Sequence, residues 1–95
     1  MRQIDGKYAV SGPIMNVRKG EVIPEDEPLI LMRGRDRLVP TALDHYWMLR
    51  QQAGAETGAQ NRLAQTIIEM RQWQDANPGR TRLPDQADSP KDDVR

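Results

Sequence analysis

Apolar residues recur at helical spacing from residue 38 to residue 77, and Gly54 interrupts the pattern once. The two stripes repeat every three or four positions, as on helices that pack one face against a neighbour. Glycine suits the residue that ends a helix, and the run Asn77-Pro78-Gly79 ends the second stripe. Because only a few residues separate the stripes, the spacing predicts an antiparallel two-helix hairpin over residues 38–77.

The residues before this hairpin show short extended segments instead. Turn signals at Asp5-Gly6, Gly12-Pro13 and Gly20 separate apolar pieces that are too short for helices. Residues 29–33 begin with four consecutive apolar side chains, which is typical of a strand buried on both faces. Residues 7–33 are therefore predicted to form a small antiparallel sheet packed by the helical hairpin, and the fold class is α+β.

The C-terminal segment has a different composition. Residues 79–95 lack a hydrophobic period, and Leu83 and Val94 are their only large apolar residues. Such a segment cannot offset the entropy lost on ordering, which predicts a flexible tail, although residues 80–84 remain candidates for docking on the body. We expect a single α+β domain over residues 1–78.

The charge balance and the missing cysteines exclude several classes of site. Lysine and arginine together number 14, as do aspartate and glutamate, so the net charge is zero and nucleic-acid binding is disfavoured. No cysteine or histidine set suits a structural zinc, and the glycine-rich phosphate loops of nucleotide-binding folds are missing. We predict no metal site and no cofactor. Small domains without covalent staples often depend on self-association, which favours a homo-oligomer.

The distribution of apolar residues also bears on location. No apolar run approaches the roughly 20 residues that span a bilayer, and the first ten residues lack the apolar region of a signal peptide. We therefore expect a cytoplasmic protein without a membrane partner.

Three arginines form the most unusual cluster in the sequence. Arg33, Arg35 and Arg37 alternate around a glycine just before the first predicted helix. Guanidinium groups bind phosphate or carboxylate through paired hydrogen bonds, so the pattern favours a phosphate-bearing ligand. The alternative is that the cluster pairs within the molecule with nearby acids, namely Glu25, Asp26, Glu27 and Asp36.

Two aromatic residues follow this cluster on the first predicted helix. Tyr46 and Trp47 are candidates for stacking on the base of a nucleotide. The alternative assigns them to the core or to an oligomer interface, because phenylalanine is absent and aromatic bulk is scarce.

Catalytic groups are poorly represented. His45 is the only histidine, and its neighbour Asp44 points about 100° away on a helix, so the two do not form an acid–base pair. Neither Ser11 nor Ser89 lies in the turn pattern of a serine nucleophile. We predict that the protein is not an enzyme.

Residues 20–49, GEVIPEDEPLILMRGRDRLVPTALDHYWML, carry a family resemblance. An IPEDEP turn, an apolar segment, an Arg-x-Arg-Asp segment and a helix with a tyrosine resemble small uncharacterised proteins of bacteriophages, prophages and actinobacteria. The resemblance carries over no catalytic residue. It implies a phage accessory protein that acts in the host cytoplasm by binding a host factor or by sequestering a small signalling molecule.

These patterns together support one main hypothesis and two alternatives. The main hypothesis is a non-enzymatic, phage-type accessory protein that binds a phosphorylated small molecule, such as a nucleotide signal of host defence. Its ligand-binding residues would be Arg33, Arg35, Arg37, Tyr46 and Trp47. The alternatives are a protein-interaction module that modulates a host protein and a weak nucleic-acid binder.

Overall fold

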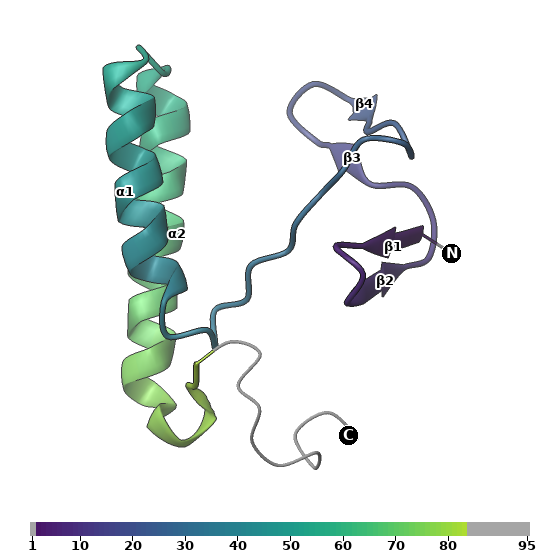
Figure 1. Ribbon diagram of the computed structural model, residues 1–95. Coiled ribbons are helices and arrows are strands. Elements are labelled where there is room, and N and C mark those ends of the chain that lie inside the picture. The colour runs from purple at the N-terminus through teal and green to yellow at the C-terminus, as the bar shows by residue number, and fades with distance from the viewer. Residues whose placement is uncertain (1, 84–95) are drawn as a thin grey trace. The chain divides into compact units, whose positions relative to one another are not determined.

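The computed structural model describes residues 2–83. Contacts divide the chain into two compact units, the first ending at Met32 and the second beginning at Arg33. The single domain over residues 1–78 stays a prediction. The first unit holds the strands and the second holds the helices (Figure 1).

Two short β-hairpins make up the regular structure of the first unit. Strand β1 (Arg2–Ile4) pairs with β2 (Tyr8–Val10), and β3 (Met15–Asn16) pairs with β4 (Glu21–Val22), both in antiparallel register. The predicted sheet over residues 7–33 is thus wrong in extent, because the structure has two separate two-stranded sheets and the first begins at Arg2.

The turn that joins β1 to β2 lies at Asp5-Gly6, where the sequence predicts a turn. Asp5 and Gly6 both have a positive φ, of 50° and 72°, and the amide of Lys7 donates to the carbonyl of Ile4 at 3.1 Å. Positive φ at both central residues matches the right-handed twist of paired strands, and aspartate and glycine tolerate it best. The local sequence therefore fixes this hairpin.

The strand predicted for residues 29–33 is not present. Ile30 is 70% exposed, and the amide of Leu31 donates to the Asp5 carboxylate at 3.2 Å instead of to a neighbouring strand. The preceding residue, Pro28, has no N–H to contribute to a ladder. The four apolar residues therefore form an irregular segment, tied to the first hairpin through Asp5.

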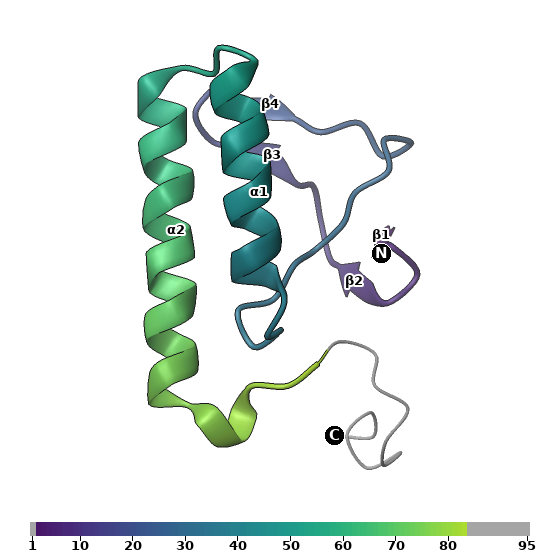
Figure 2. The same cartoon turned by 60° about the vertical axis from the view of Figure 1, so that its left-hand side comes forward.

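The second unit is a pair of antiparallel helices, α1 (Val39–Gln52) and α2 (Thr57–Ala76), as Figure 1 and Figure 2 both show. Gly54 has a φ of 83° in the connection, which is the conformation that ends helices. The prediction of a two-helix hairpin is confirmed, and with the two sheets it confirms the α+β class. Neither helix is both long enough and apolar enough to cross a membrane.

A few buried side chains hold the helices together. Val39 and Ile67 are 4% and 5% exposed. Gln60 is 3% exposed, and its amide nitrogen donates to the carbonyl of Trp47 at 2.9 Å. The indole N–H of Trp47 donates in return to the Gln60 carbonyl at 3.1 Å. This reciprocal pair fixes the register of α1 against α2, because a shift of one turn would leave buried polar groups without partners.

The chain does not leave the hairpin at residue 79, where the flexible tail was predicted to begin. A 3₁₀ turn (Pro78–Arg80) follows α2, and Arg82 then forms a parallel β-bridge with Asp36. The prediction is wrong for residues 79–83 because backbone hydrogen bonds dock them on the segment before α1, as the alternative for residues 80–84 anticipated. The remaining part of the predicted tail, residues 84–95, lies outside the described residues.

An ion pair between the helices gives a pH-dependent prediction. The hydrogen-bonded guanidinium of Arg71 holds the pKa of the Asp44 carboxyl below its ordinary value. A lowered folded-state pKa contributes stability that is present above the unfolded-state pKa and is lost as pH falls through the folded-state pKa. We expect Asp44→Asn to lower the free energy of unfolding slightly at pH 7, where urea titration would measure it, because both partners are about half exposed.

The control is the same pair of titrations at low pH. Once the pH falls through the lowered folded-state pKa of Asp44, both Asp44 and its asparagine replacement are uncharged, so the difference in stability between the two proteins should shrink. A stability difference that is unchanged between neutral and acidic pH would contradict the assignment to this ion pair.

Candidate anion-binding pocket

A pocket of about 340 Å³ lies in the second unit, at the end of the hairpin where α1 begins and α2 ends. The loop before α1, the last turns of α2 and the segment after α2 all contribute to it. We call it the arginine pocket, and its lining consists of Arg33, Gly34, Arg35, Trp73, Arg80 and Arg82.

Gln74 on α2 fixes the loop that carries the first two arginines. Its side-chain amide nitrogen donates to the carbonyls of Gly34 at 2.9 Å and of Asp36 at 2.8 Å. The amide of Asp36 also closes a turn on the carbonyl of Arg33 at 3.1 Å. The Gln74 side chain therefore holds the loop against α2 at two carbonyl groups. This fixes the backbone from which the side chains of Arg33 and Arg35 extend.

The segment after α2 also holds this loop in place, through backbone hydrogen bonds. The amide of Arg82 donates to the Arg35 carbonyl at 3.0 Å, and the amide of Arg37 donates to the Arg82 carbonyl at 2.9 Å. These two hydrogen bonds form the parallel bridge between Asp36 and Arg82. They bring an arginine from the C-terminal segment beside the arginines of the loop, although the two segments are far apart in the sequence.

Trp73 and Asn77 position the fourth arginine. The guanidinium carbon of Arg80 lies 4.8 Å from the centre of the Trp73 ring, within the range of a cation–π contact. A guanidinium nitrogen of Arg80 also donates to the Asn77 side-chain oxygen at 3.1 Å, and the Asn77 amide donates to the Trp73 carbonyl at 2.8 Å. Arg80 is therefore held at the rim of the pocket by a ring face and by a hydrogen bond.

The lining is strongly positive. The described residues that line it carry four guanidinium groups and no acidic side chain. The nearest acid in sequence, Asp36, uses its carboxylate to accept the Leu38 amide at 2.9 Å. The ion pair between Arg71 and Asp44 lies outside the lining. A site of this kind is suited to an anion.

The alternative of pairing with Glu25, Asp26 and Glu27 stays a prediction. Those acids belong to the first unit, whereas the arginine pocket is built within the second.

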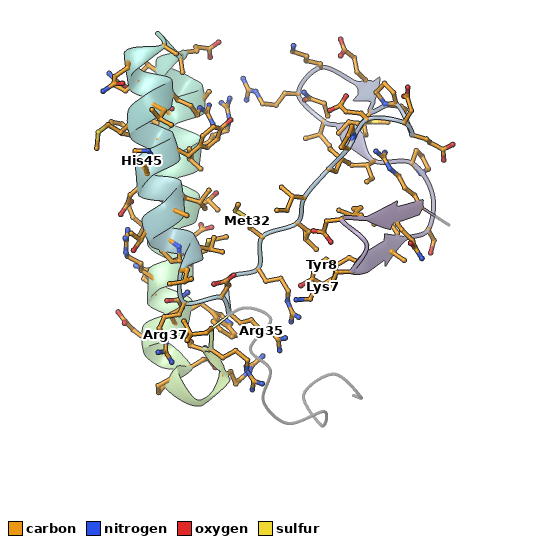
Figure 3. All side chains as sticks on the ribbon, in the orientation of Figure 1. Lys7, Tyr8, Met32, Arg35, Arg37 and His45 are labelled. Carbon is orange, nitrogen blue, oxygen red and sulfur yellow. The ribbon has the colours of Figure 1, made fainter. Side chains whose placement is uncertain are left out.

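The structure brings together two of the five residues predicted to bind a ligand. Arg33 and Arg35 line the pocket, while Arg37, Tyr46 and Trp47 do not. Figure 3 shows Arg35 and Arg37 at the end of the hairpin where α1 begins, and Arg37 contributes its backbone amide to the bridge.

The predicted aromatic pair lies elsewhere on α1. Trp47 is engaged with Gln60 between the helices, as the core alternative anticipated. Tyr46 is 52% exposed on α1, where the Arg50 guanidinium lies 5.5 Å from its ring centre. Neither ring is placed to stack on a ligand held by the arginine pocket.

Four lining residues were not predicted to bind a ligand, namely Gly34, Trp73, Arg80 and Arg82. One signal was available in the sequence. Arg80-Thr81-Arg82 repeats the Arg-x-Arg spacing of Arg33-Gly34-Arg35, and Asn77-Pro78-Gly79 lies just before it as a chain-reversing turn. One Arg-x-Arg segment precedes the helical hairpin and the other follows it. The two segments meet when the chain turns back after the second helix.

Metal binding finds no support within residues 2–83. No group of three or more acidic or histidine side chains in this part of the chain is arranged to hold a metal ion. His45 lies exposed on α1 (Figure 3) and is not a lining residue. Comparisons of the chain with protein families, with curated proteins and with solved structures returned no match.

Proposed function

We propose that this protein binds a phosphorylated small molecule in the arginine pocket and does so without catalysing a reaction on it. The observation that carries the proposal is the convergence of four guanidinium groups from two distant segments on one pocket. Guanidinium groups stay charged and present several N–H donors in a plane, which matches the oxygens of phosphate.

The preorganisation of the pocket supports specific binding over a loose surface charge. Gln74 and the two backbone hydrogen bonds of Arg82 hold the arginine-bearing segments before a ligand arrives. Fixing these segments in advance lowers the entropy lost on binding. A free surface cluster of arginines would lose more conformational freedom for the same contacts.

The chemistry of the lining supports binding rather than catalysis. Its side chains are arginine and tryptophan, together with one glycine. A guanidinium group remains protonated near neutral pH and cannot act as a general base, and an indole is not a nucleophile. The resemblance of residues 20–49 to phage proteins extends the proposal to an accessory role in a host cell.

Thermal denaturation with a panel of phosphorylated compounds tests the proposal. A ligand at about 100 times its Kd stabilises the folded state by about 2.7 kcal/mol, which raises the Tm of a small domain by about 10 °C or more. We expect the double variant Arg33→Ala/Arg35→Ala to lose this rise, because half of the guanidinium groups are removed.

The matched control is Arg50→Ala/Arg62→Ala, which removes the same charge from helix positions outside the lining. It should retain the rise in Tm. The proposal fails if no phosphorylated compound raises the Tm, or if the two double variants respond alike.

A further inference from the structure

Resting on the proposed function, we infer that Arg80 is the specificity-determining residue of the arginine pocket and that Trp73 is its positioning residue. Arg80 takes two oxygens of one phosphate group with a pair of N–H donors, while the Trp73 ring holds its guanidinium group. The phosphate is thus recognised by its geometry and not by its charge alone. The inference rests on the contacts that hold Arg80 and on the donors that these contacts leave available.

A short turn after α2 fixes the backbone of Arg80. The amide of Arg80 donates to the Asn77 carbonyl at 3.0 Å, and the hydroxyl group of Thr81 donates to the same carbonyl at 2.9 Å. Pro78 begins this 3₁₀ turn, and its ring restricts the backbone angle φ. The turn brings Arg80 back to the end of α2, where it meets Trp73.

Two contacts hold the guanidinium group of Arg80 itself. Its central carbon lies 4.8 Å from the centre of the Trp73 ring, and Nη1 donates to Oδ1 of Asn77 at 3.1 Å. Asn77 is tied to α2 in turn, because its Nδ2 donates to the Trp73 carbonyl at 2.8 Å. An arginine side chain loses conformational entropy when a ligand orders it, and contacts formed beforehand reduce that loss. Arg80 is therefore in place before a ligand arrives.

These contacts leave Arg80 able to bind an anion. A guanidinium group carries five N–H donors, and a cation–π contact draws on its charge without using them as hydrogen-bond donors. Within residues 2–83, the hydrogen bond from the Arg80 side chain to Asn77 uses one of the five. Paired donors in one plane match two oxygens of a phosphate, a geometry that an ammonium group does not reproduce.

The two arginines of the loop before α1 are held in a different way. Their hydrogen bonds within residues 2–83 are made by the backbone. The carbonyl of Arg33 accepts the amide of Asp36 at 3.1 Å, and the carbonyl of Arg35 accepts an amide of the segment after α2 at 3.0 Å. A ligand must therefore order both of these side chains on binding, which costs entropy. They supply positive charge to the pocket, whereas Arg80 supplies a donor pair that is already positioned.

Isothermal titration calorimetry with inorganic phosphate and AMP tests this ranking, with adenosine as the control that lacks a phosphate. We expect Arg80→Lys to weaken binding of both anions by at least about tenfold, because the charge stays but the planar donor pair is lost. Arg33→Lys should weaken binding by less than about threefold, because the charge that Arg33 supplies is retained. Adenosine should not bind.

Arg50→Lys is the matched control. Arg50 also lies near an aromatic ring, 5.5 Å from the centre of the Tyr46 ring, but it does not line the pocket. This variant should bind inorganic phosphate and AMP as the parent protein does. A loss equal to that of Arg80→Lys would show that the pocket does not depend on Arg80 in particular, and the inference would fall.

Variants at Trp73 test its positioning role. Trp73→Leu should weaken AMP binding by about tenfold, and Trp73→Phe should restore most of the affinity, because a phenyl ring keeps a face for Arg80. In a protein that already carries Arg80→Ala, Trp73→Leu should cause less than about threefold further loss, because the two residues act as one unit. Losses that add fully in the double variant would contradict a role exerted through Arg80.

The outcomes separate this inference from the proposed function. If Arg80→Lys binds both anions as tightly as the parent protein, or loses no more than Arg33→Lys, the inference falls and the proposed function stands. Adenosine that binds as tightly as AMP would also overturn the inference, because recognition would then lie outside the phosphate. If neither inorganic phosphate nor AMP binds, the inference falls, and the wider panel of phosphorylated compounds decides the proposed function separately.

Discussion

Ile67→Ala is expected to lower the free energy of unfolding of the helical hairpin by about 3 kcal/mol, within the range of about 2–5 kcal/mol for such truncations of buried residues. Ile67 is 5% exposed on α2, and few large apolar side chains of the described residues are buried. The surrounding structure has little other packing with which to refill the space. Urea denaturation followed by circular dichroism measures the change.

The neighbouring residue provides the matched control. Ile68 is the same residue type on the same helix, but it is 48% exposed. Ile68→Ala should therefore cost less than about 1 kcal/mol, because most of the removed surface is already in contact with water. Equal losses at the two positions would show that α2 presents a different face to α1 from the one described above.

Gln74→Met is expected to lower stability by about 2 kcal/mol and to weaken binding of the phosphorylated compound that raises the Tm by at least about tenfold. The substitution keeps the length of the side chain but removes its amide, so the carbonyls of Gly34 and Asp36 both lose a donor. A hydrogen bond of this kind contributes about 1 kcal/mol, and partly buried acceptors without partners cost more. The affinity falls because the loop no longer holds Arg33 and Arg35 in place.

Gln72→Met is the matched control, since Gln72 is exposed on the same helix and does not line the pocket. It should leave both the free energy of unfolding and the affinity for the same phosphorylated compound close to those of the parent protein. Full affinity for this compound in Gln74→Met would contradict the role of Gln74 in arranging the pocket.

The helices could be predicted because their signals are local. The repeat of apolar residues and the stops at Gly54 and Asn77-Pro78-Gly79 lie within the segments that they define. The run of four apolar residues after Pro28 was misleading for the opposite reason. Whether such a run becomes a strand depends on a free edge elsewhere in the chain, and here the Asp5 carboxylate takes the amide of Leu31.

Only two of the four arginines in the candidate site could be predicted from the sequence. Arg33 and Arg35 could be predicted because they are close together in the sequence and next to a helix start. Arg80 and Arg82 join them through a β-bridge between distant segments, which no local pattern specifies. Residues 79–95 are poor in apolar side chains, and their composition therefore predicted a flexible tail. The backbone hydrogen bonds that dock residues 79–83 do not depend on apolar side chains, so the composition could not reveal them.

The bridge between Asp36 and Arg82 also determines where the second unit can be cut. A chain shortened at Gly79 would keep both helices of the hairpin and would be expected to fold and be helical. It would nevertheless lack two of the four guanidinium groups of the pocket. It would also lack the backbone hydrogen bonds of Arg82 that hold the loop before α1. The boundary of the helical hairpin and the boundary of the proposed anion-binding pocket therefore differ, and a fragment chosen by its helices alone would be expected to fold without binding the proposed ligand.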